Sequence, residues 1–499
     1  MRSRSQPGPR RAAHNAGGEC GRVRGSGQAR DPVTLAFDDL LRLPDFDDVR
    51  RYVPKYDQPG PRYTSYPTAP VWTEDFDESE FREALARARN RKLSLYIHIP
   101  FCERLCSFCA CNKTITQDHA VGGPYLDGLE REAEMLASAI GGERRCVQLA
   151  VGGGTPTFLS PQELARMCRV VDSHFPPDAN AERSVEVDPR VTSRAQLEVL
   201  SEHGFNRISL GVQDFAPRVQ RAINRVQSRE QTERITLDAR ALGYASVNFD
   251  LIYGLPFQTV ASFGETLDQV IALRPDRIAL YSYAHVTWIV KAQRGFEKKD
   301  LPSAERKLAI MLLASQRLGE AGYRFLGLDH FALPQDELCV AAASGDLRRN
   351  FNGYTIRAGV DLIALGASGI SELADAYAQS VRAPEPWREQ VMKGHLATLR
   401  GWRLTPDDVR RKWLIQRLMC QGEVSERAYA NAFGEALTER IPDLRPRLAP
   451  FVEDGLLVPD GEDYRVTPLG RLFLRVIAMS FDAYLPEPDL ERPMFSRTV

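Results

Sequence analysis

Short apolar runs alternate with longer amphipathic stretches between residues 93 and 283. The runs have the length and the β-branched and aromatic content of strands, and the stretches between them show the apolar spacing of helices. The predicted strands are Leu93–Ile99, Val147–Val151, Ser184–Val187, Arg207–Val212, Ser246–Ile252 and Arg277–Tyr283. The predicted helices are Tyr125–Ala139, Pro161–His174, Ser193–His203, Arg229–Leu242 and Val260–Leu273. This alternation predicts a parallel sheet with helices outside it, arranged as a partial or complete (β/α) barrel or as a doubly wound open sheet.

The first predicted strand alternates cleanly between apolar and polar residues. Ser94, Tyr96 and His98 share one face, and we expect that face to point into the mouth of a barrel. Each predicted strand also finishes in glycine or a polar residue. These strand ends are Gly152–Thr155, Glu186–Asp188, Gln213–Asp214, Asp250 and Tyr283–His285. Barrel enzymes build their sites at this edge, so the pattern favours an α/β fold with a partial (β/α)6 barrel.

Different patterns flank the barrel and define four predicted domains: a disordered Arg-rich tail at 1–30, an N-terminal arm at 31–92, the barrel at 93–375, and a C-terminal domain at 376–499. Residues 1–30 are rich in Arg, Gly, Ser and Pro and lack a foldable apolar face. The last domain is predicted to hold helices, a β-hairpin and a final helix, which together resemble a winged helix. These elements are Leu404–Arg417, Ser425–Phe433, Leu444–Asp454, the hairpin 455–466, and Leu469–Phe481. Acidic and basic residues are mixed there, which favours a packing or lid domain over DNA binding.

Composition and charge argue against a nucleic-acid-binding, membrane or secreted protein. The chain has 499 residues and a net charge of −1, so no global field attracts nucleic acid or anionic lipid. No apolar run reaches the roughly eighteen residues of a membrane span, and no secretory segment is recognisable. We therefore expect a cytoplasmic protein, a monomer, with no nucleic-acid or membrane partner.

Four of the nine cysteines fall within ten residues, directly after the first strand: Cys102, Cys106, Cys109 and Cys111. Such a cluster indicates a metal site in a reducing compartment. Three thiolates spaced x3 and x2 can bind three irons of a [4Fe–4S] cubane and leave the fourth iron open to the amino and carboxylate groups of S-adenosylmethionine (SAM). The alternatives are a zinc site, which this spacing fits poorly, and a four-cysteine electron carrier that includes Cys111. The glycine run 152–154 on the next strand favours the SAM-cleaving cluster.

Residues near the cysteines are candidates to bind SAM beside such a cluster. Phe108 is placed to cover an adenine and exclude water. The glycine run lets backbone N–H groups approach the SAM amino acid, although it also suits a plain tight turn. Glu186 and Asp250 are candidates to bind ribose hydroxyls or the SAM ammonium, and the alternative for each is a helix N-cap. His98, facing inward beside the cluster, is more consistent with function than with a core position.

Longer motifs resemble a known family. They include Gly60-Pro-Arg-Tyr-Thr-Ser-Tyr-Pro-Thr68, Tyr96-Ile-His-Ile-Pro-Phe-Cys102, Cys109-Ala-Cys-Asn-Lys113, Gly152-Gly-Gly-Thr-Pro-Thr157, Glu186-Val-Asp-Pro-Arg190, Gly211-Val-Gln-Asp-Phe215, Asp250-Leu-Ile-Tyr-Gly-Leu-Pro256, Asp329-His-Phe-Ala332, Asn350-Phe-Asn-Gly-Tyr-Thr355 and Phe495-Ser-Arg497. From about Lys55 to the C-terminus the chain resembles the oxygen-independent coproporphyrinogen III oxidases, which are radical SAM enzymes. The Gly60–Thr68 segment and Cys111 distinguish it from the related haem chaperones.

The resemblance implies a role for each matching residue. Cys102, Cys106 and Cys109 would ligate the cluster, and Cys111 would not. The cluster-bound SAM would be lined by Tyr96, Gly153, Glu186, Ala284 and Ile370. A second SAM molecule would be bound by Phe108, Gly154, Thr155, Gln213, Arg225 and Asp250. We count Tyr96, His98 and Cys111 as the catalytic candidates, and expect the Gly60–Thr68 segment to help close the barrel mouth.

The implied reaction is an oxidative decarboxylation in anaerobic haem biosynthesis. Two propionates of coproporphyrinogen III become vinyl groups with loss of two CO2, and an electron donor and an electron acceptor serve as further partners. Because the substrate carries four carboxylates, we expect arginines at the mouth, with Arg62, Arg348, Arg349 and Arg497 as candidates.

Several positions depart from the family pattern. Asn352 stands where Gln is usual, residues 286–288 differ after Tyr283-Ala-His285, and Ala110 replaces a usual glycine. Asn352 is the best support for an alternative substrate, and three alternatives to the oxidase remain open. They are a radical SAM paralogue such as a haem-degrading methyltransferase, a non-catalytic haem carrier or chaperone, and an Fe–S regulator that binds DNA.

Overall fold

The computed structural model describes residues 46–288, 290–486 and 494–498. The predicted tail at 1–30 lies outside the described residues, and so does the first part of the predicted arm.

A parallel sheet forms the centre of the molecule and contains all of the predicted strands. They are β1 (Leu93–Ile99), β4 (Cys146–Gly153), β5 (Pro177–Val187), β6 (Arg207–Gln213), β7 (Ser246–Tyr253) and β8 (Arg277–Ser282). These strands lie side by side in chain order, and each pair of neighbours is parallel. A doubly wound sheet needs a reversal of strand order, and none occurs among these six strands. The prediction of a partial (β/α)6 barrel is therefore confirmed.

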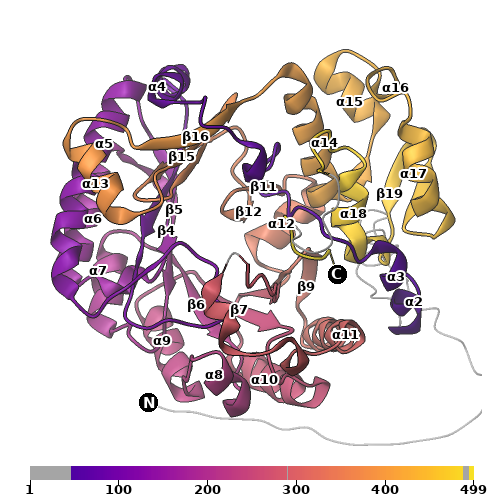
Figure 1. Cartoon of the computed structure of the whole chain (residues 1–499), viewed down its shortest axis with the longest axis horizontal. Coiled ribbons are helices and arrows are strands. Elements are labelled where there is room, and N and C mark those ends of the chain that lie inside the picture. Colours follow the sequence, from indigo (N-terminus) through magenta and orange to yellow (C-terminus); the bar gives the residue numbers. More distant parts are fainter. Residues whose placement is uncertain (1–45, 289, 487–493, 499) are drawn as a thin grey trace, which may run out of the picture.

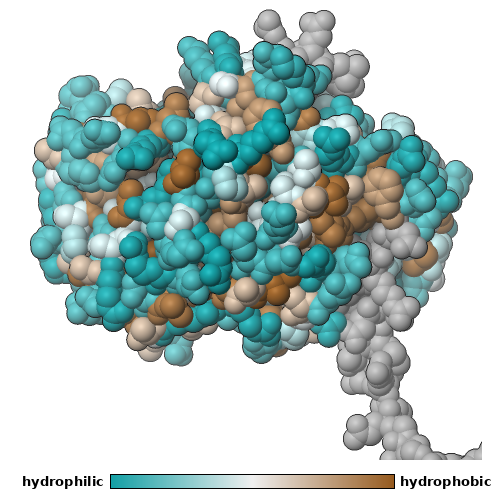
Figure 2. Space-filling model, turned by 90° about the horizontal axis from the view of Figure 1, so that it is seen from below, coloured by the Kyte–Doolittle hydropathy of each residue, from teal (hydrophilic) through white to brown (hydrophobic). Residues whose placement is uncertain are grey.

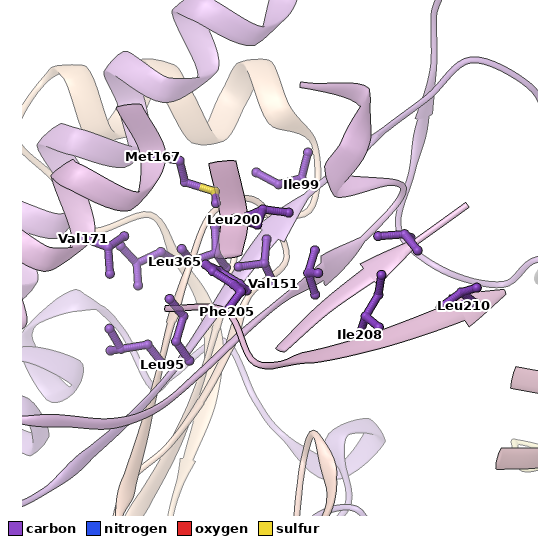
Figure 3. Packing of buried hydrophobic residues seen from close by; sticks show 14 of the residues in the cluster. Leu95, Ile99, Val151, Met167, Val171, Leu200, Phe205, Ile208, Leu210 and Leu365 are labelled. Carbon is purple, nitrogen blue, oxygen red and sulfur yellow. The ribbon is translucent and has the colours of Figure 1, made fainter. Parts of the chain in front are cut away.

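Helices cover the outside of this curved sheet (Figure 1). They are α5 (Gly122–Ile140), α6 (Pro161–His174), α7 (Arg194–Glu202), α8 (Pro217–Ala222), α9 (Arg229–Ala241), α10 (Val260–Leu273) and α11 (Ala304–Glu320). Hydroxyl-bearing N-caps fix where several of them begin: Ser160 caps α6 and Ser193 caps α7, each in a reciprocal capping box. Side chains of the sheet and of these helices meet in one core, seen in Figure 3, where Leu95 and Val151 of the sheet lie near Met167 and Val171 of α6.

Strand β1 shows how the sequence pattern sets the two faces of the sheet. Leu95 and Ile99 are fully buried in the core between sheet and helices. Tyr96 and His98, at the alternate positions, line a cavity inside the barrel. The predicted inward direction of this polar face is therefore correct.

The sheet continues beyond the six predicted strands at both edges. On one side, β13 (Asp361–Leu365) pairs in parallel with β1, followed by antiparallel β14 (Ile370–Glu372), β15 (Ala376–Ser380) and β16 (Thr398–Arg403). On the other side lie antiparallel β10 (His330–Ala332) and β9 (Arg324–Gly327), followed along the chain by α12 (Glu337–Ser344) and a hairpin of β11 (Arg348–Asn350) and β12 (Gly353–Thr355). Helix α13 (Pro384–Met392) buries Trp387 in the barrel core. The hydrogen-bonded sheet thus runs past the predicted boundary at 375/376 as far as Arg403.

The C-terminal domain contains the predicted helices and hairpin. It consists of α14 (Pro406–Gln421), β17 (Glu423–Val424), α15 (Glu426–Phe433), α16 (Leu437–Arg440), α17 (Leu444–Glu453), β18 (Leu457–Asp460), β19 (Asp463–Val466) and α18 (Leu474–Met479). The three strands form one small sheet in the order β17-β19-β18. Helices followed by a small antiparallel sheet fit the winged-helix-like prediction.

The N-terminal arm joins the two ends of the molecule. Its helices α2 (Phe46–Arg50) and α3 (Val53–Tyr56) lie beside the C-terminal domain, whereas α4 (Glu78–Arg87) packs at the far edge of the barrel (Figure 1). Tyr56, Tyr63 and Tyr66 belong to the hydrophobic core of the C-terminal domain. Arg475 of α18 holds the arm against the C-terminal domain by donating hydrogen bonds to the backbone carbonyls of Gly60 and Pro61.

Hydrophobic residues are scattered among hydrophilic ones on the face seen in Figure 2. None of the helices that the structure describes combines the length and apolar character needed to cross a lipid bilayer.

Candidate functional site

The four clustered cysteines lie on a loop that leaves the end of β1. Short strands β2 (Phe101–Cys102) and β3 (Thr114–Ile115) pair in parallel and close the base of this loop. Lys113 Nζ donates hydrogen bonds to the carbonyl oxygens of Cys109 (2.8 Å) and Cys111 (3.3 Å). The loop is therefore held by its own backbone and needs no disulfide to keep its shape.

Two cavities meet at this loop. The cysteine cavity has a volume of about 450 Å³ and is lined by Cys102, Cys106, Cys109 and Cys111. The barrel cavity, about 680 Å³, occupies the interior of the barrel and includes Tyr96, His98 and Ile370 in its wall. Both cavities share the residues Cys111, Gly153, Glu186, Ser209 and Asp250. The thiols and the inner wall of the barrel therefore face one connected space.

Charged groups surround the thiols on one side of the cysteine cavity. Arg190 and Arg225 each place a guanidinium nitrogen 3.6 Å from Cys106 Sγ. Both arginines also donate to the same oxygen of Asp188, at 2.6 Å and 3.0 Å. Burial opposes ionisation of Asp188, but Arg225 and Arg190 hold its pKa below the ordinary value. The result is a fixed pair of cations directed at one sulfur atom.

The donor set fits an iron–sulfur cubane better than a single metal ion. Cys102 Sγ lies 3.4 Å from Thr155 Oγ1, while Cys106 lies against the arginine pair, so the thiols project from different points of the loop. Within the described ranges no group of three or more His, Cys, Asp or Glu side chains converges as a site for one ion. A cubane takes one thiolate per iron, so three separated thiols around one cavity suit it. Zinc, which needs four converging ligands, does not match this arrangement.

Cys109 and Cys111 behave as a hydrogen-bonded pair. The hydrogen bond from Cys111, followed by the charges of Lys113 and Arg225, lowers the pKa of the Cys109 thiol to about 6 against the effect of burial. The same contact with Cys109, together with burial, raises the pKa of Cys111 well above its ordinary value. Cys111 is accessible from the cavity. Both sulfurs therefore lie at the wall of the cysteine cavity.

Tyr96 and His98 form a hydrogen-bonded chain in the wall of the barrel cavity. His98 Nε2 lies 2.9 Å from the Asn112 carbonyl oxygen, which can only accept, so Nε2 carries the proton. The other ring nitrogen, Nδ1, then accepts from the Tyr96 hydroxyl at 3.1 Å. Burial lowers the pKa of His98. The imidazole is thus neutral and fixes the direction of the tyrosine hydroxyl.

Two carboxyl groups face the shared part of the cavities. Burial, followed by the charge of Asp250, raises the pKa of Glu186 to about 7. Burial likewise raises the pKa of Asp250 to about 6, although hydrogen bonds from Ser209 (2.9 Å) and Asn248 (2.9 Å) oppose the shift. Both carboxyl groups are accessible from the cavities, so they are suited to receive a cation from a ligand, or to accept hydrogen bonds from hydroxyl groups.

The glycine run lets the backbone approach these groups closely. Gly153 has a φ of 117°, and its N–H donates to Glu186 at 3.3 Å. A Cβ atom at Gly153 would lie 2.8 Å from the His98 ring and 2.9 Å from the carbonyl oxygen of Ile99. Only glycine fits this position, because both the φ angle and the space exclude a side chain.

Most of the other predicted residues also lie at these cavities. Phe108, Gly154, Thr155, Gln213 and Arg225 line the cysteine cavity. Gln213, at the end of β6, has a φ of 66°, a strained conformation of the kind found at functional sites.

Ala284 is the exception among the predicted residues. It lines a third space of about 660 Å³, the interdomain cavity between arm, barrel and C-terminal domain. Gln293 links it to the cysteine loop by donating to the carbonyl oxygens of both Ala284 (3.0 Å) and Phe108 (3.2 Å). The positions that depart from the family pattern divide between cavities: Asn352 lines the barrel cavity, and residues 286–288 line the interdomain cavity.

Sequence reasoning missed the partners of Cys106. Asp188 and Arg190 were visible within the motif Glu186–Arg190, but nothing in one sequence pairs Arg190 with a cysteine 84 residues away. His330 and Tyr281 in the barrel cavity were missed for the same reason.

Comparison with known proteins gives a consistent result along the chain. The radical SAM superfamily model matches residues 96–270, and the HemN C-terminal domain model matches residues 404–473. The oxygen-independent coproporphyrinogen III oxidase of Pseudomonas aeruginosa is 43% identical over 459 residues, covering 91% of this chain and 98% of that protein. The enzyme of the same name from Escherichia coli K12 is 44% identical over 451 residues, covering 90% and 97%. The solved structure of coproporphyrinogen III oxidase (HemN) from E. coli, described as a radical SAM enzyme, superposes with a TM-score of 0.83 at 43% identity, covering 85% of this chain and 98% of that one.

Proposed function

The chain belongs to the family of oxygen-independent coproporphyrinogen III oxidases within the radical SAM superfamily, and from this membership we infer that it converts coproporphyrinogen III to protoporphyrinogen IX. It is a SAM-dependent oxidoreductase with a [4Fe–4S] cluster. The observation that supports this function best is the connected space in which three thiols meet the interior of a barrel large enough for a tetrapyrrole.

Cys102, Cys106 and Cys109 are the residues we propose as cluster ligands. These residues would hold a [4Fe–4S] cluster, which would supply the electron needed to generate a carbon radical from SAM for hydrogen abstraction at the β-carbon of a substrate propionate. Arg190 and Arg225 hold positive charge against Cys106, and Thr155 lies against Cys102, so both sulfurs have fixed neighbours. Such contacts orient metal ligands and tune their basicity.

Two sets of residues are proposed to hold SAM. Tyr96, Gly153, Glu186 and Ile370 surround the barrel side of the shared space and suit the cluster-bound molecule. Phe108, Gly154, Thr155, Gln213, Arg225 and Asp250 surround the cysteine side and suit a second molecule. Glu186 and Asp250 would receive an ammonium group or ribose hydroxyls from SAM. Ala284, which the resemblance places in the first set, lines the interdomain cavity and is linked through Gln293 to Phe108 of the second set.

The catalytic candidates hold fixed positions beside the substrate space. The His98 imidazole keeps the Tyr96 hydroxyl directed within the wall of the barrel cavity. Cys111, which is paired to Cys109, is the cysteine that faces both cavities while remaining outside the proposed ligand set.

The reaction balances with an external acceptor. Each propionate loses one hydrogen atom to the radical, one CO2 and one electron, and becomes a vinyl group; two propionates react in this way. An electron donor for the cluster and an acceptor for the substrate electron complete the proposed set of partners.

Anaerobic turnover tests this function. Enzyme with a reconstituted cluster is supplied with a chemical reductant, SAM, coproporphyrinogen III and an electron acceptor, and the porphyrins and 5′-deoxyadenosine are separated by chromatography. We expect protoporphyrinogen IX from wild type and none from Cys102→Ser. Formation of 5′-deoxyadenosine without decarboxylated product would refute the assigned substrate and favour a paralogue that acts on another tetrapyrrole.

A further inference from the structure

Arg349 carries a buried positive charge that no acidic group matches. It lies in β11, opposite Tyr354 of β12, and only 6% of the residue is exposed. Its Nε and Nη1 atoms are buried without a hydrogen-bond partner, and the structure shows no ion pair to its guanidinium among the described residues. The ring of Tyr354, 5.2 Å from the guanidinium carbon, is its neighbour. A cation–π contact compensates only part of the cost of burying an arginine.

The other arginines that the sequence suggested for substrate carboxylates are already engaged. Arg62 pairs with Asp329, and Arg497 Nε donates to Asp57 at 2.6 Å. Arg348 Nη1 donates to the carbonyl oxygens of Gly345 and Leu347 at 2.8 Å and 2.9 Å.

The other arginines near the barrel cavity are either paired with carboxylates or accessible to solvent. Arg277 is paired with Asp336 and Glu337. Arg382 is exposed and Arg400 is half-buried, so water solvates both guanidinium groups. Among the described residues, Arg349 thus carries a guanidinium that has neither an ion pair nor open contact with solvent.

Aromatic residues connect Arg349 to the barrel cavity. Tyr354 contacts His330 edge-on, with ring centroids 5.1 Å apart, and His330 contacts Tyr281 at 6.2 Å. All three rings line the cavity. His330 Nδ1 is also buried without a partner. Burial, with the charges of Arg349, Arg62 and Arg277, lowers the pKa of His330 to about 3, so a neutral imidazole lies between Arg349 and the cavity.

This wall stands on β8, β10 and the β11–β12 hairpin, whereas the cysteine loop follows β1. Tyr96 stands on β1 and His330 on β10, and the five strands from β4 to β8 separate them in the sheet. A ligand that fills the cavity therefore has one side near Tyr96 and Cys111 and another near Tyr281, His330 and Tyr354.

We propose that Arg349, acting across the wall formed by Tyr281, His330 and Tyr354, supplies the positive charge that holds a non-reacting carboxylate of the substrate. This assignment rests on the proposed function, since it requires a substrate with several carboxylates. A carboxylate that leaves as CO2 must lose its negative charge, and an arginine bound to it would oppose that loss. The carboxylate held here is therefore one that remains in the product, and the role of Arg349 is to position the substrate.

Equilibrium binding tests the assignment. The cluster-loaded enzyme, without SAM or reductant so that no turnover occurs, is titrated anaerobically with coproporphyrinogen III. Arg349→Met removes the charge but keeps the aliphatic stem over Tyr354. Because the guanidinium lies behind the aromatic wall and acts on the carboxylate through it, we expect the Kd to rise about 10-fold. Arg349→Lys should bind within a few-fold of wild type. The control Arg465→Met removes the same charge from the β18–β19 hairpin, where the side chain is 57% exposed and pairs with Asp460, and it should leave the Kd unchanged.

Stability without substrate separates a binding role from a structural one. Because the charge is unmatched in the unliganded protein, Arg349→Met should raise the Tm of the cluster-loaded enzyme, whereas removal of a structural arginine lowers it. Weaker binding together with a Tm at or above that of wild type supports the assignment.

Two results would overturn it: an unchanged Kd for Arg349→Met, or a lowered Tm that accompanies weaker binding. In either case wild type still binds and converts coproporphyrinogen III, so the proposed function stands. Failure of wild type itself to bind would instead refute the proposed function, and this assignment with it.

Discussion

Glu132 gives the barrel a pH-dependent stability whose sign and size follow from its surroundings. This α5 side chain is 2% exposed and accepts hydrogen bonds from the Gly366 N–H (2.6 Å) and from the Trp387 indole (3.0 Å). Burial raises its pKa from 4.5 to about 7, although both hydrogen bonds oppose the shift. Between these values the folded protein binds more protons than the unfolded chain, so its stability falls as the pH rises.

The size of the effect follows from the two pKa values. Below pH 4.5 both states are protonated and Glu132 carries no penalty; above pH 7 the penalty is complete at about 3 kcal/mol. Between pH 5 and pH 8 it grows by about 2.5 kcal/mol. Glu132→Gln removes the ionisable group. The free energy of unfolding of the variant minus that of wild type should therefore increase by about 2.5 kcal/mol between pH 5 and pH 8, whatever the difference is at pH 5.

The assay is urea unfolding of both cluster-loaded proteins under anaerobic conditions at several pH values. Comparison at each pH cancels contributions that other groups make equally to both proteins. Glu439→Gln serves as control, because its carboxylate is exposed and the difference from wild type should be flat. A flat or falling difference for Glu132→Gln would refute the reasoning, since it would show that folding does not favour the protonated form of Glu132.

Three further predictions concern the site. Gly153→Ala should destabilise the protein by about 2–4 kcal/mol in urea unfolding and should weaken SAM binding. The control Gly243→Ala also has a positive φ but has open space around it, so it should destabilise the protein less. Equal losses of stability would contradict the role of the His98 contact. Arg225→Met should lower turnover about 10- to 100-fold while the iron content is retained. The control Arg221→Met, at a nearby exposed arginine, should leave turnover unchanged. Normal turnover of Arg225→Met would show that the cation beside Cys106 is dispensable. Cys102→Ser should lose the cluster while Cys111→Ser keeps about four irons per chain, and equal loss of iron from both would place Cys111 among the ligands.

The fold was largely predictable where one face of an element meets the core. The alternation in β1 and the helical spacing in α6 and α10 gave their bounds to the residue, because burial on a single face leaves a strong pattern. β5 begins at Pro177, seven residues earlier than predicted, since its first residues are polar and carry no strand signal. The pairing of β13 with β1 was not predicted, because it joins segments more than 260 residues apart and depends on tertiary structure.

The site was predictable where the chemistry is local. The cysteine spacing and the glycine run are short motifs, and the structure brings both to one cavity. The contact of Arg190 and Arg225 with Cys106 and the unmatched charge of Arg349 arise only when distant segments fold together. A single sequence identifies the residue types within a motif, but it does not show which charged side chains are paired in a buried site.

Hydrogen abstraction from the substrate is the central claim, and an isotope label tests it most directly. Coproporphyrinogen III deuterated at the β-carbons of its propionates is converted anaerobically, and the 5′-deoxyadenosine is analysed by mass spectrometry. We predict 5′-deoxyadenosine that is one mass unit heavier, together with protoporphyrinogen IX. Unlabelled 5′-deoxyadenosine alongside unconverted substrate would contradict the claim, because SAM would then be cleaved without any attack on the propionate.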